Sequence, residues 1–544
     1  MKANKLPFTD AQTDAIAYAG SMVITACPGS GKTTVMVEKI RGEFDSLKRH
    51  QGVIGISFTI KSSDELAIKC KRNGANVKSS FFGTIDNFCL VEIIFPFAAR
   101  VFSGVNSELS TKRYSSLEKV YMDCLPDLSI PEINFSTEDC DTYWSEFSKH
   151  YDAGFILLEA VTVIAYKILE ESAACRRYIM ARYCSVYVDE YQDTSEPQHS
   201  LFLKLHSLGL KSVAVGDIQQ SIFAFRGSDP SHLLSLVADS HSFEHHVLDV
   251  NHRSHPSIVN YANRLYSPSC HLLPVNKINV FHRTFTGSQI NVAVDLDGWI
   301  RKSAEILKIE DFSDIAILVR WNSAIDCLQK NLSIPARFYK DDHLSKLSSP
   351  VGRFFAALLY FYYDERKLVE EVLDAFPVVK VNTGKLISLR KSIASIRQLP
   401  LSDISSAFAS LTIFFNFPRE FSAEITALQE TIASTDELAH YEKVKSGEVQ
   451  VMTLHKSKGL EFDMVLHLDL YDWVFPKRAY TGDFNEEVFP EWDQDLNLHY
   501  VGVTRAKKWC VLITSKQRVN SDGDIKKGNP SKFLSLPGLA GLYR

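Results

Sequence analysis

Short runs of apolar, mostly β-branched residues recur along the chain, and polar residues usually follow them. Each run is nearly continuous rather than alternating, which is typical of a strand buried on both faces of a parallel sheet. Strands are expected at Met22–Thr25, Gly52–Phe58, Ser185–Val188, Ser212–Val215, Asp314–Val319, Val449–Leu454, Asp463–Leu468 and Cys510–Thr514. Helices between them are expected at Thr33–Glu43, Pro197–Leu208 and Pro256–Leu265. This alternation predicts an α/β fold.

The expected strands fall into two groups, and a helix-rich insertion interrupts each group. We expect the first α/β domain at residues 1–89 and 183–245 and its insertion at 90–182. The second is expected at 246–349 and 445–544, with its insertion at 350–444. Helices of the two insertions are expected at Leu117–Cys124, Ile156–Glu171, Val351–Phe361, Lys385–Ile396 and Ala423–Ala433.

Charge and cysteine usage narrow the class of protein. The net charge of −5 over 544 residues excludes a protein that coats nucleic acid with its whole surface, although a local basic groove remains compatible. The ten cysteines are scattered without zinc-binding spacing, as in a reducing cytosol. The first residues lack an apolar signal core, and Phe354–Tyr363 is too short to span a bilayer. We therefore expect a cytoplasmic protein that does not bind membranes.

A phosphate-binding loop follows the first expected strand. It reads Ala26-Cys27-Pro28-Gly29-Ser30-Gly31-Lys32-Thr33, with a helix expected from Thr33. Its glycines let backbone amides curl around phosphates, the helix N-terminus adds its dipole, and Lys32 adds a positive charge. The hydroxyl of Thr33 is expected to bind Mg²⁺. The segment predicts a site for ATP and Mg²⁺.

Two adjacent carboxylates, Asp189 and Glu190, come directly after the strand Ser185–Val188. Such a pair at a strand end is usually a solvated loop, but beside a phosphate loop it suits metal-assisted hydrolysis. Asp189 would hold Mg²⁺ through water, and Glu190 would orient and deprotonate the attacking water.

The order of further motifs resembles the UvrD/Rep/PcrA helicases of superfamily 1 from one end of the chain to the other. That family has two RecA-like P-loop domains with parallel sheets, each carrying a helical insertion, and we expect the same here. The resemblance is carried by Phe8–Gln12, Ser57–Lys61, Gly83–Phe88, Asp189–Thr194, Gly216–Gly227, Leu248–Ser254, Val451–Phe462, Phe475–Pro476 and Tyr500–Ala506.

The resemblance implies roles for residues of the nucleotide site. The nucleotide would lie between the two RecA-like domains. Gln219 would sense the γ-phosphate from the first domain, and Arg253 and Arg505 would reach it from the second as arginine fingers. Gln12 would read the adenine, and Glu461 would hold the ribose.

The DNA-binding residues follow from the same resemblance and from general stacking chemistry. Aromatic rings can stack bases whatever their sequence, and hydroxyl groups and imidazoles can contact phosphates or sugars. An aromatic residue beside a strand end is more often part of the core. The candidates for single-stranded DNA are Phe58, Thr59, Thr84, Phe225, Thr453 and His455, with Phe223 as a weaker one.

Several positions depart from the family pattern. His252 stands where the family has a tyrosine that stacks on adenine, and Thr34 stands where an arginine often packs on the other face of the base. Asp86 replaces a histidine, and its carboxylate would repel the phosphates of DNA. The run 494–497 departs from the family's motif of two glutamates and two arginines, which precedes the last motif. The insertions are also small for the family. Together these features indicate a divergent branch.

The resulting hypothesis is an ATP-dependent translocase or helicase on single-stranded DNA, with 3′→5′ polarity taken from the family. A P-loop ATPase that acts as a switch or remodelling subunit is the alternative, and stimulation of hydrolysis by single-stranded DNA would discriminate the two. A catalytically inactive DNA-binding scaffold ranks last, because Lys32, Thr33, Asp189, Glu190, Arg253 and Arg505 are all present. A compact helicase that works with a separate nuclease, as in Gabija-type antiphage systems, is a further alternative based on size.

Overall fold

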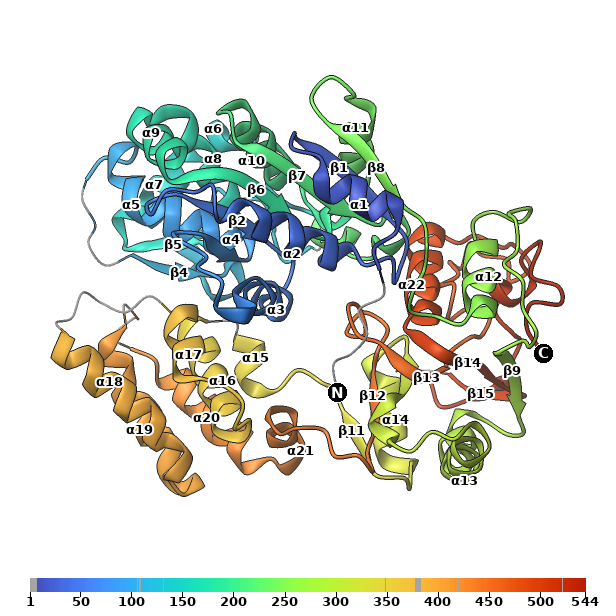
Figure 1. Cartoon of the computed structure of the whole chain (residues 1–544). Coiled ribbons are helices and arrows are strands. Elements are labelled where there is room, and N and C mark those ends of the chain that lie inside the picture. Colours follow the sequence, from blue (N-terminus) through green and yellow to red (C-terminus); the bar gives the residue numbers. More distant parts are fainter. Residues whose placement is uncertain are drawn as a thin grey trace. The chain divides into compact units, whose positions relative to one another are not determined.

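The chain folds into two compact units (Figure 1). The first comprises Met1–Ser254 and Asp493–Tyr500, and the second comprises His255–Trp492 and Val501–Arg544. The computed structural model describes residues 7–104, 106, 109–130, 132–347, 349–376, 383–415, 417, 420–520 and 522–544. Within these residues, no helix combines the length and apolar character needed to cross a lipid bilayer.

Unit 1 is built on a six-stranded parallel sheet of order β3-β2-β6-β7-β1-β8. Apolar side chains cover both faces of its interior strands, so each face needs a layer of helices. Helices α1 (Asp10–Ala17), α2 (Lys32–Glu43) and α3 (Ile60–Lys71) pack on one face, and α8, α10 and α11 pack on the other. The strands are β1 Met22–Ala26, β2 Gly52–Ile56, β3 Phe81–Gly83, β6 Tyr183–Val188, β7 Lys211–Gly216 and β8 Glu244–Leu248.

The first insertion shares its hydrophobic core with unit 1's sheet. Its helices include α7 (Trp144–Asp152), α8 (Val161–Glu171) and α9 (Ala173–Arg182). Helices α10 (Glu196–Ser207) and α11 (Ser231–Ala238) follow in the sheet domain. Because the insertion and the sheet have one core, the insertion is a rigid part of unit 1.

Two helix predictions in this insertion were wrong in whole or in part. The segment Leu117–Cys124 is not an α-helix; short 3₁₀ turns occupy Tyr114–Ser116 and Lys119–Tyr121. Pro126 follows soon after, and proline disfavours helical backbone in the residue before it. The helix expected from Ile156 starts at Val161, because Phe155–Leu157 forms strand β5 against β4 (Ser110–Lys112).

Unit 2 contains a second six-stranded parallel sheet of order β11-β12-β10-β13-β14-β9. Helices α13 (Gln289–Leu307) and α14 (Asn322–Asn331) share its core, and α12 (Pro256–Arg264) contacts β9 and β14. Helix α22 (Trp492–Thr504) precedes β14. The strands are β9 Val280–Phe285, β10 Ile315–Val319, β11 Ala336–Phe338, β12 Val449–Thr453, β13 Phe462–His467 and β14 Ala506–Ser515.

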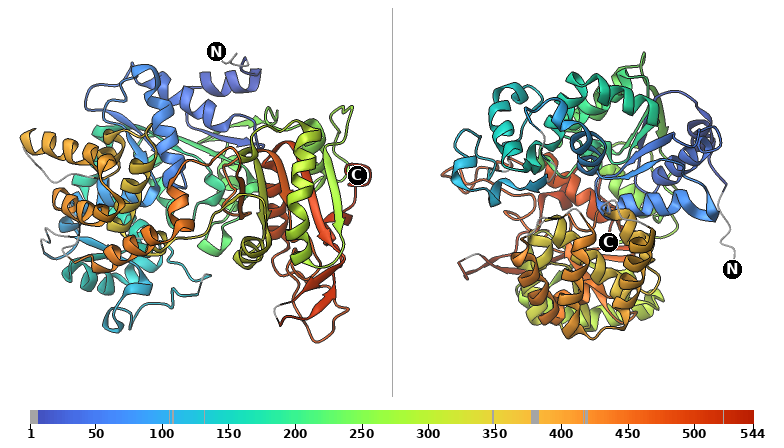
Figure 2. Two further views of the ribbon diagram at one scale, coloured as in Figure 1. Left: turned by 90° about the horizontal axis from the view of Figure 1, so that it is seen from below. Right: turned by 90° about the vertical axis from the view of Figure 1, so that its left-hand side faces the viewer.

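The second insertion is helical and has a core of its own, formed by buried residues between Leu344 and Tyr441. Figure 2 shows its helices as an orange bundle. It leaves the sheet after β11 and returns to it at β12, and these two strands are hydrogen-bonded neighbours. The helices are α15 His343–Leu347, α16 Pro350–Tyr363, α17 Val369–Ala375, α18 Thr383–Ser395, α19 Leu401–Leu411, α20 Ser422–Ala433 and α21 Thr435–Leu438.

Candidate functional site

Four adjacent strands of unit 1 bring the predicted nucleotide residues together. Strands β6, β7, β1 and β8 are neighbours in the sheet and run parallel, so their carboxyl ends lie at one edge. Asp189 follows β6, Gln219 follows β7, the phosphate loop follows β1 and Arg253 follows β8. Ligands of open α/β sheets bind at this edge.

The phosphate loop adopts a backbone that its glycines require. Gly29 and Gly31 have φ values of +71° and +81°, in the left-handed region that favours glycine. Gln12 holds the loop from α1: its Nε2 donates to the carbonyl oxygen of Ser30 at 2.8 Å. The backbone amide of Thr9 donates to Gln12 Oε1 at 2.9 Å, which fixes the same side chain. Gln12 therefore positions the loop, and its amide keeps one donor and one lone pair for a base.

Two polar groups in the loop are buried without a hydrogen-bond acceptor or donor among the described residues: Lys32 Nζ and Ser30 Oγ. The nearest counter-charge to Lys32 is Asp217, with Nζ and Oδ2 3.8 Å apart. Leaving a buried polar group unsatisfied costs about 1–3 kcal/mol. The oxygens of a phosphate group would satisfy both groups, so the loop fits the β- and γ-phosphates of a nucleotide.

The rest of the loop is fixed by strand β8. The backbone amide of Cys27 donates to the carbonyl oxygen of Leu248 at 2.9 Å. Burial raises the pKa of the Cys27 thiol to about 11, which keeps it neutral and compatible with a nearby anion. Ala26 ends β1, Pro28 is buried, and Thr34 is exposed at the start of α2.

Asp189 and Thr33 lie close enough to share a metal ion. Thr33 Oγ1 donates to Asp189 Oδ2 at 3.5 Å, from the start of α2 to the end of β6. A hydroxyl and a carboxylate beside a phosphate loop are the oxygen ligands that Mg²⁺ takes. When bound there, Mg²⁺ would neutralise the negative charge of the phosphates.

Glu190 follows in the left-handed conformation, with φ of +53°. Its backbone amide donates to Asp189 Oδ1 at 3.0 Å, and its Oε2 accepts from Gln192 Nε2 at 2.6 Å. On the neighbouring strand end, Asp217 Oδ1 accepts from the backbone amide of Gln219 at 3.1 Å. Lys32, Asp189, Glu190 and Gln219 thus follow the carboxyl ends of three neighbouring strands, β1, β6 and β7.

Asp189 should destabilise the metal-free fold when it is charged. Burial, followed by the charge of Glu190, raises the pKa of its carboxyl. The proton is therefore bound more tightly in the folded than in the unfolded chain, and stability decreases as pH rises toward the folded pKa. We expect Asp189→Asn to raise the Tm of the metal-free protein by about 2–4 °C at pH 8, and by less at pH 5. Thermal unfolding with a chelator at both pH values measures this, and an equal effect at both would contradict it.

The backbone nitrogen and Cβ of Arg253 lie close to Gly29 of the phosphate loop. A Cβ added to Gly29 would lie 2.6 Å from the Cβ of Arg253 and 2.8 Å from Asn251 Oδ1. The backbone amide of His252 donates to the carbonyl oxygen of Gly29 at 3.0 Å. Arg253 was expected to act from the second domain, but it belongs to unit 1. The side chain of His252 is exposed.

Three phenylalanines form a connected group in unit 1. The rings of Phe58 and Phe223 stack with centroids 4.9 Å apart, and Phe223 meets Phe225 edge to face at 6.0 Å. Phe223 is 9% exposed, whereas Phe225 is 45% exposed. The guanidinium of Arg226 lies over both rings of the loop. Phe225 is therefore a partly exposed ring beside a positive charge, and Phe223 packs between it and Phe58.

Thr59 and Thr84 lie at neighbouring strand ends and cap helices. Thr59 Oγ1 accepts from the backbone amide of Ser62 at 3.1 Å, and Thr84 Oγ1 accepts from that of Asn87 at 3.3 Å. Thr59 begins α3, so the positive end of a helix lies beside it. Asp86 Oδ1 accepts from Thr162 Oγ1 at 3.4 Å, which engages this carboxylate within unit 1.

The remaining predicted residues belong to unit 2. Thr453 ends β12 and is buried, while His455 and Glu461 follow in the next loop, where Glu461 is exposed. Arg505 is only 2% exposed. Its guanidinium donates to the carbonyl oxygens of Val501 at 3.0 Å and Leu460 at 3.2 Å. These bonds connect the Arg505 side chain to the end of α22 and to the loop before β13.

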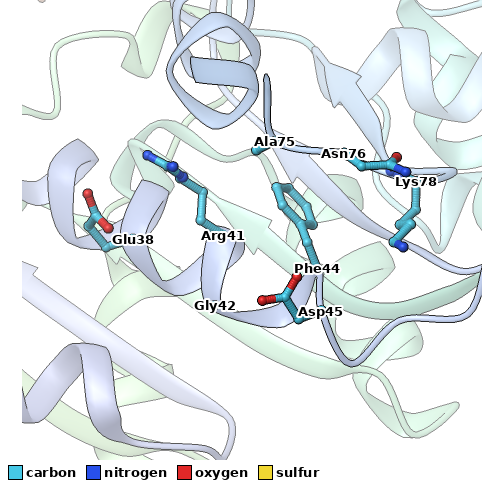
Figure 3. Close-up of a pocket in the computed structure, with 8 residues that line it drawn as sticks. All are labelled: Glu38, Arg41, Gly42, Phe44, Asp45, Ala75, Asn76 and Lys78. Atoms are coloured by element: carbon cyan, nitrogen blue, oxygen red, sulfur yellow. The ribbon is translucent and has the colours of Figure 1, made fainter. Parts of the chain in front are cut away.

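A pocket of about 360 Å³ lies at the far end of α2 from the phosphate loop (Figure 3). Its lining contains two positively charged and two negatively charged side chains, so their formal charges sum to zero. None of the residues predicted to bind nucleotide or DNA belongs to it. The lining residues are Glu38, Arg41, Gly42, Phe44, Asp45, Ala75, Asn76 and Lys78.

Two buried residues of the site were missed from the sequence. Asp217 pairs with Lys32, and Gln192 joins Glu190 to the loop after β7. Burial raises the pKa of Asp217 while Lys32 lowers it. Asp217 lies two residues after a predicted strand and Gln192 lies four residues after another, both inside motifs that were recognised. That position is the signal that could have identified them.

Two family models match most of the chain. The UvrD/REP helicase N-terminal domain matches residues 8–150 and 141–241, and the UvrD-like helicase C-terminal domain matches residues 364–517. The first contains the phosphate loop, both carboxylates and the phenylalanine group. The second contains Thr453, His455, Glu461 and Arg505.

Individual relatives agree over nearly the whole length. Gabija protein GajB of Bacillus cereus (strain VD045) is 26% identical over 527 residues, covering 92% of this chain and 94% of the relative. ATP-dependent DNA helicase PcrA of Bacillus subtilis (strain 168) is 22% identical, covering 92% and 81%. ATP-dependent DNA helicase Rep of Buchnera aphidicola subsp. Schizaphis graminum (strain Sg) is 22% identical, covering 95% and 94%. With two RecA-like units and both family models matched, this chain belongs to the UvrD-like family of ATP-dependent DNA helicases.

Proposed function

We propose that this protein hydrolyses ATP at the edge of unit 1's sheet in order to move along single-stranded DNA. The observation that carries the proposal is the placement of two sets of residues on one sheet. Lys32, Asp189 and Glu190 follow strands β1 and β6, and Phe58 follows β2, the neighbour of β6. Phe225 lies in the loop after β7, the strand between β6 and β1. A change at the phosphates can therefore reach the aromatic group through loops that follow neighbouring strands of one sheet.

Each proposed residue has a chemical task. Lys32, Ser30 and the loop amides would bind the phosphates of ATP, and Thr33 and Asp189 would hold Mg²⁺. Glu190 would take the proton of the attacking water. Gln219 and Arg253, on adjacent strand ends, would neutralise charge that develops on the γ-phosphate. The role of Arg505 as an arginine finger stays a prediction from the resemblance.

The direction and the substrate follow from the resemblance to the UvrD/Rep/PcrA group. We propose 3′→5′ movement, and unwinding of duplexes that carry a 3′ single-stranded tail. The test compares ATP hydrolysis with and without an unstructured single-stranded DNA, and then strand separation on duplexes with a 3′ or a 5′ tail. Stimulation by DNA together with separation of only the 3′-tailed duplex is expected. Hydrolysis that ignores DNA would favour the switch ATPase instead.

Phe225→Ala should weaken binding to single-stranded DNA while ATP hydrolysis without DNA is retained. Stacking on an aromatic ring contributes about 1–3 kcal/mol per base, so the Kd should rise about 5- to 150-fold. Fluorescence anisotropy with a labelled oligonucleotide measures the change. Phe484→Ala is the matched control, because Phe484 is an exposed phenylalanine of unit 2 beside acidic residues. An unchanged Kd for Phe225→Ala would mean that this ring does not stack on bases.

A second proposal concerns the biological setting. The similarity to GajB extends over 94% of that protein, whereas PcrA of Bacillus subtilis is covered to 81%. We propose that this chain acts in antiviral defence beside a separate nuclease. The same hydrolysis assay tests the dependence on a partner: stimulation by DNA that needs the added nuclease supports it, and full stimulation and unwinding by the chain alone argues against it.

A further inference from the structure

We propose that Gln192 is the positioning residue through which bound DNA controls the proposed catalytic base, Glu190. The inference rests on the proposed function and adds a residue to it. Gln192 is completely buried, with an exposed fraction of 0%. Both ends of its side-chain amide are engaged. Nε2 donates to Glu190 Oε2 at 2.6 Å, and Oε1 accepts from the backbone amide of Asp217 at 2.9 Å.

The packing around Gln192 leaves its side chain little room to move. A Cβ added to Gly216 would lie 2.7 Å from Gln192 Oε1 and 3.3 Å from its backbone nitrogen. Glycine at this position lets the end of β7 approach the amide closely. A displacement of the backbone at Gly216 or Asp217 must therefore displace the amide, and with it the hydrogen bond to Glu190.

The segment that Gln192 contacts leads directly to the aromatic group. Ser221 Oγ donates to the backbone carbonyl oxygen of Gln192 at 3.3 Å. Phe223 and Phe225 follow Ser221 by two and four residues. On the other side, Asn497 Nδ2 donates to the carbonyl oxygen of Ser221 at 2.8 Å, within the same unit. Gln192 thus holds both the start and the middle of the loop that carries the stacking rings.

This geometry connects two events. Stacking of a base on Phe225 shifts the loop 217–225, and Gln192 transfers that shift to the carboxylate of Glu190. The carboxylate lies on a left-handed residue at the end of β6, so its direction depends on such side-chain bonds. Gln192 itself needs no contact with ATP, DNA or metal for this role. Its loss should affect the response to DNA more than the binding of either ligand.

The experiment measures steady-state ATP hydrolysis of Gln192→Met with and without single-stranded DNA. Methionine keeps the length of the side chain and removes its hydrogen bonds to Glu190 and Asp217, together with a longer one from Nε2 to Asp193 Oδ2 at 3.4 Å. We expect the stimulation by DNA to fall about tenfold or more. The Kd values for a nucleotide analogue and for an oligonucleotide should stay within about threefold of the unsubstituted chain. Gln192→Ala, which removes the amide without adding a charge beside Glu190, should show the same loss if the methionine variant does not fold.

Gln198→Met is the matched control. Gln198 belongs to the next helix, and its Oε1 accepts from the backbone amide of Ser195 at 3.2 Å as part of a helix cap. This variant should keep full stimulation. Normal stimulation in folded Gln192 variants would overturn the inference, as would a joint loss of nucleotide binding, DNA binding and thermal stability. If the unsubstituted chain itself shows no stimulation, the proposed function fails first, and the two failures are thereby distinguished.

Discussion

Replacing Lys32 with alanine should abolish ATP hydrolysis, with a fall in kcat of about 10²–10³-fold or more. Loss of one preorganised group that stabilises charge in a transition state costs about this much. Lys32 Nζ is buried and lies 3.8 Å from Asp217 Oδ2, so it is already placed for phosphate and is only weakly engaged. Steady-state hydrolysis with saturating single-stranded DNA is the measurement.

The Lys32→Ala variant should still fold, although buried Asp217 loses its nearest counter-charge. Thermal unfolding without nucleotide should therefore show a cooperative transition at a somewhat lower Tm than that of the unsubstituted chain. Lys204→Ala is the matched control: Lys204 pairs with Glu170 on the surface at 3.0 Å, and its loss should leave hydrolysis unchanged. Normal turnover by Lys32→Ala would remove the phosphate loop from the mechanism.

Replacing Glu190 with glutamine should stop turnover while ATP still binds. The substitution keeps the shape of the side chain, and the new amide oxygen can still accept from Gln192 Nε2. An amide cannot take a proton from water at neutral pH, and loss of a general base costs about 10²–10⁴-fold in rate. Single-turnover hydrolysis and equilibrium binding of a fluorescent nucleotide separate the two effects. The variant should bind the nucleotide with a Kd within a few-fold of normal.

Glu196→Gln provides the same chemical change at a structural carboxylate. Glu196 accepts from the backbone amide of Thr137 at 2.7 Å and from Ser200 Oγ at 2.6 Å, far from the phosphate loop in sequence. Its loss should lower stability without a comparable effect on turnover. If Glu190→Gln still hydrolyses ATP at a normal rate, another group accepts the proton and the assignment of Glu190 is incorrect.

The strands that the sequence predicted are the interior strands of the two sheets. All eight expected strands are present, as β1, β2, β6, β7, β10, β12, β13 and β14. In the two six-stranded sheets the missed strands are β3, β8, β9 and β11, which are their edges; the two-stranded sheets β4-β5 and β15-β16 were also missed. Strand β8 has three exposed residues among its five, because only one side of it pairs. A search for continuous apolar runs finds strands buried on both faces, and edge strands lack that signal.

In the nucleotide site, too, some features could be predicted from the sequence and others could not. The phosphate loop and the two carboxylates could be identified locally, because their chemistry depends on neighbours in sequence. The approach of Arg253 to Gly29 depends on β8 lying beside β1, and β8 was one of the missed strands. The burial of Arg505 depends on backbone carbonyls that no pattern of residue types reveals. Gln192 belongs to a motif that the sequence reveals. Its partner Asp217 is brought close to it only by the pairing of β6 with β7.

The separate core of the second insertion has a consequence for the evolution of such chains. Its two ends are tied to neighbouring strands: the amide of Tyr339, after β11, donates to the carbonyl oxygen of Val451 in β12 at 2.8 Å. The entry and exit points are thus fixed side by side by the sheet itself. A segment attached in this way can gain or lose helices over generations while the strands around it keep their register. Variation in the length of this insertion is therefore a route by which related proteins can acquire different accessory functions, while the two sheets and the loops that follow their strands stay unchanged.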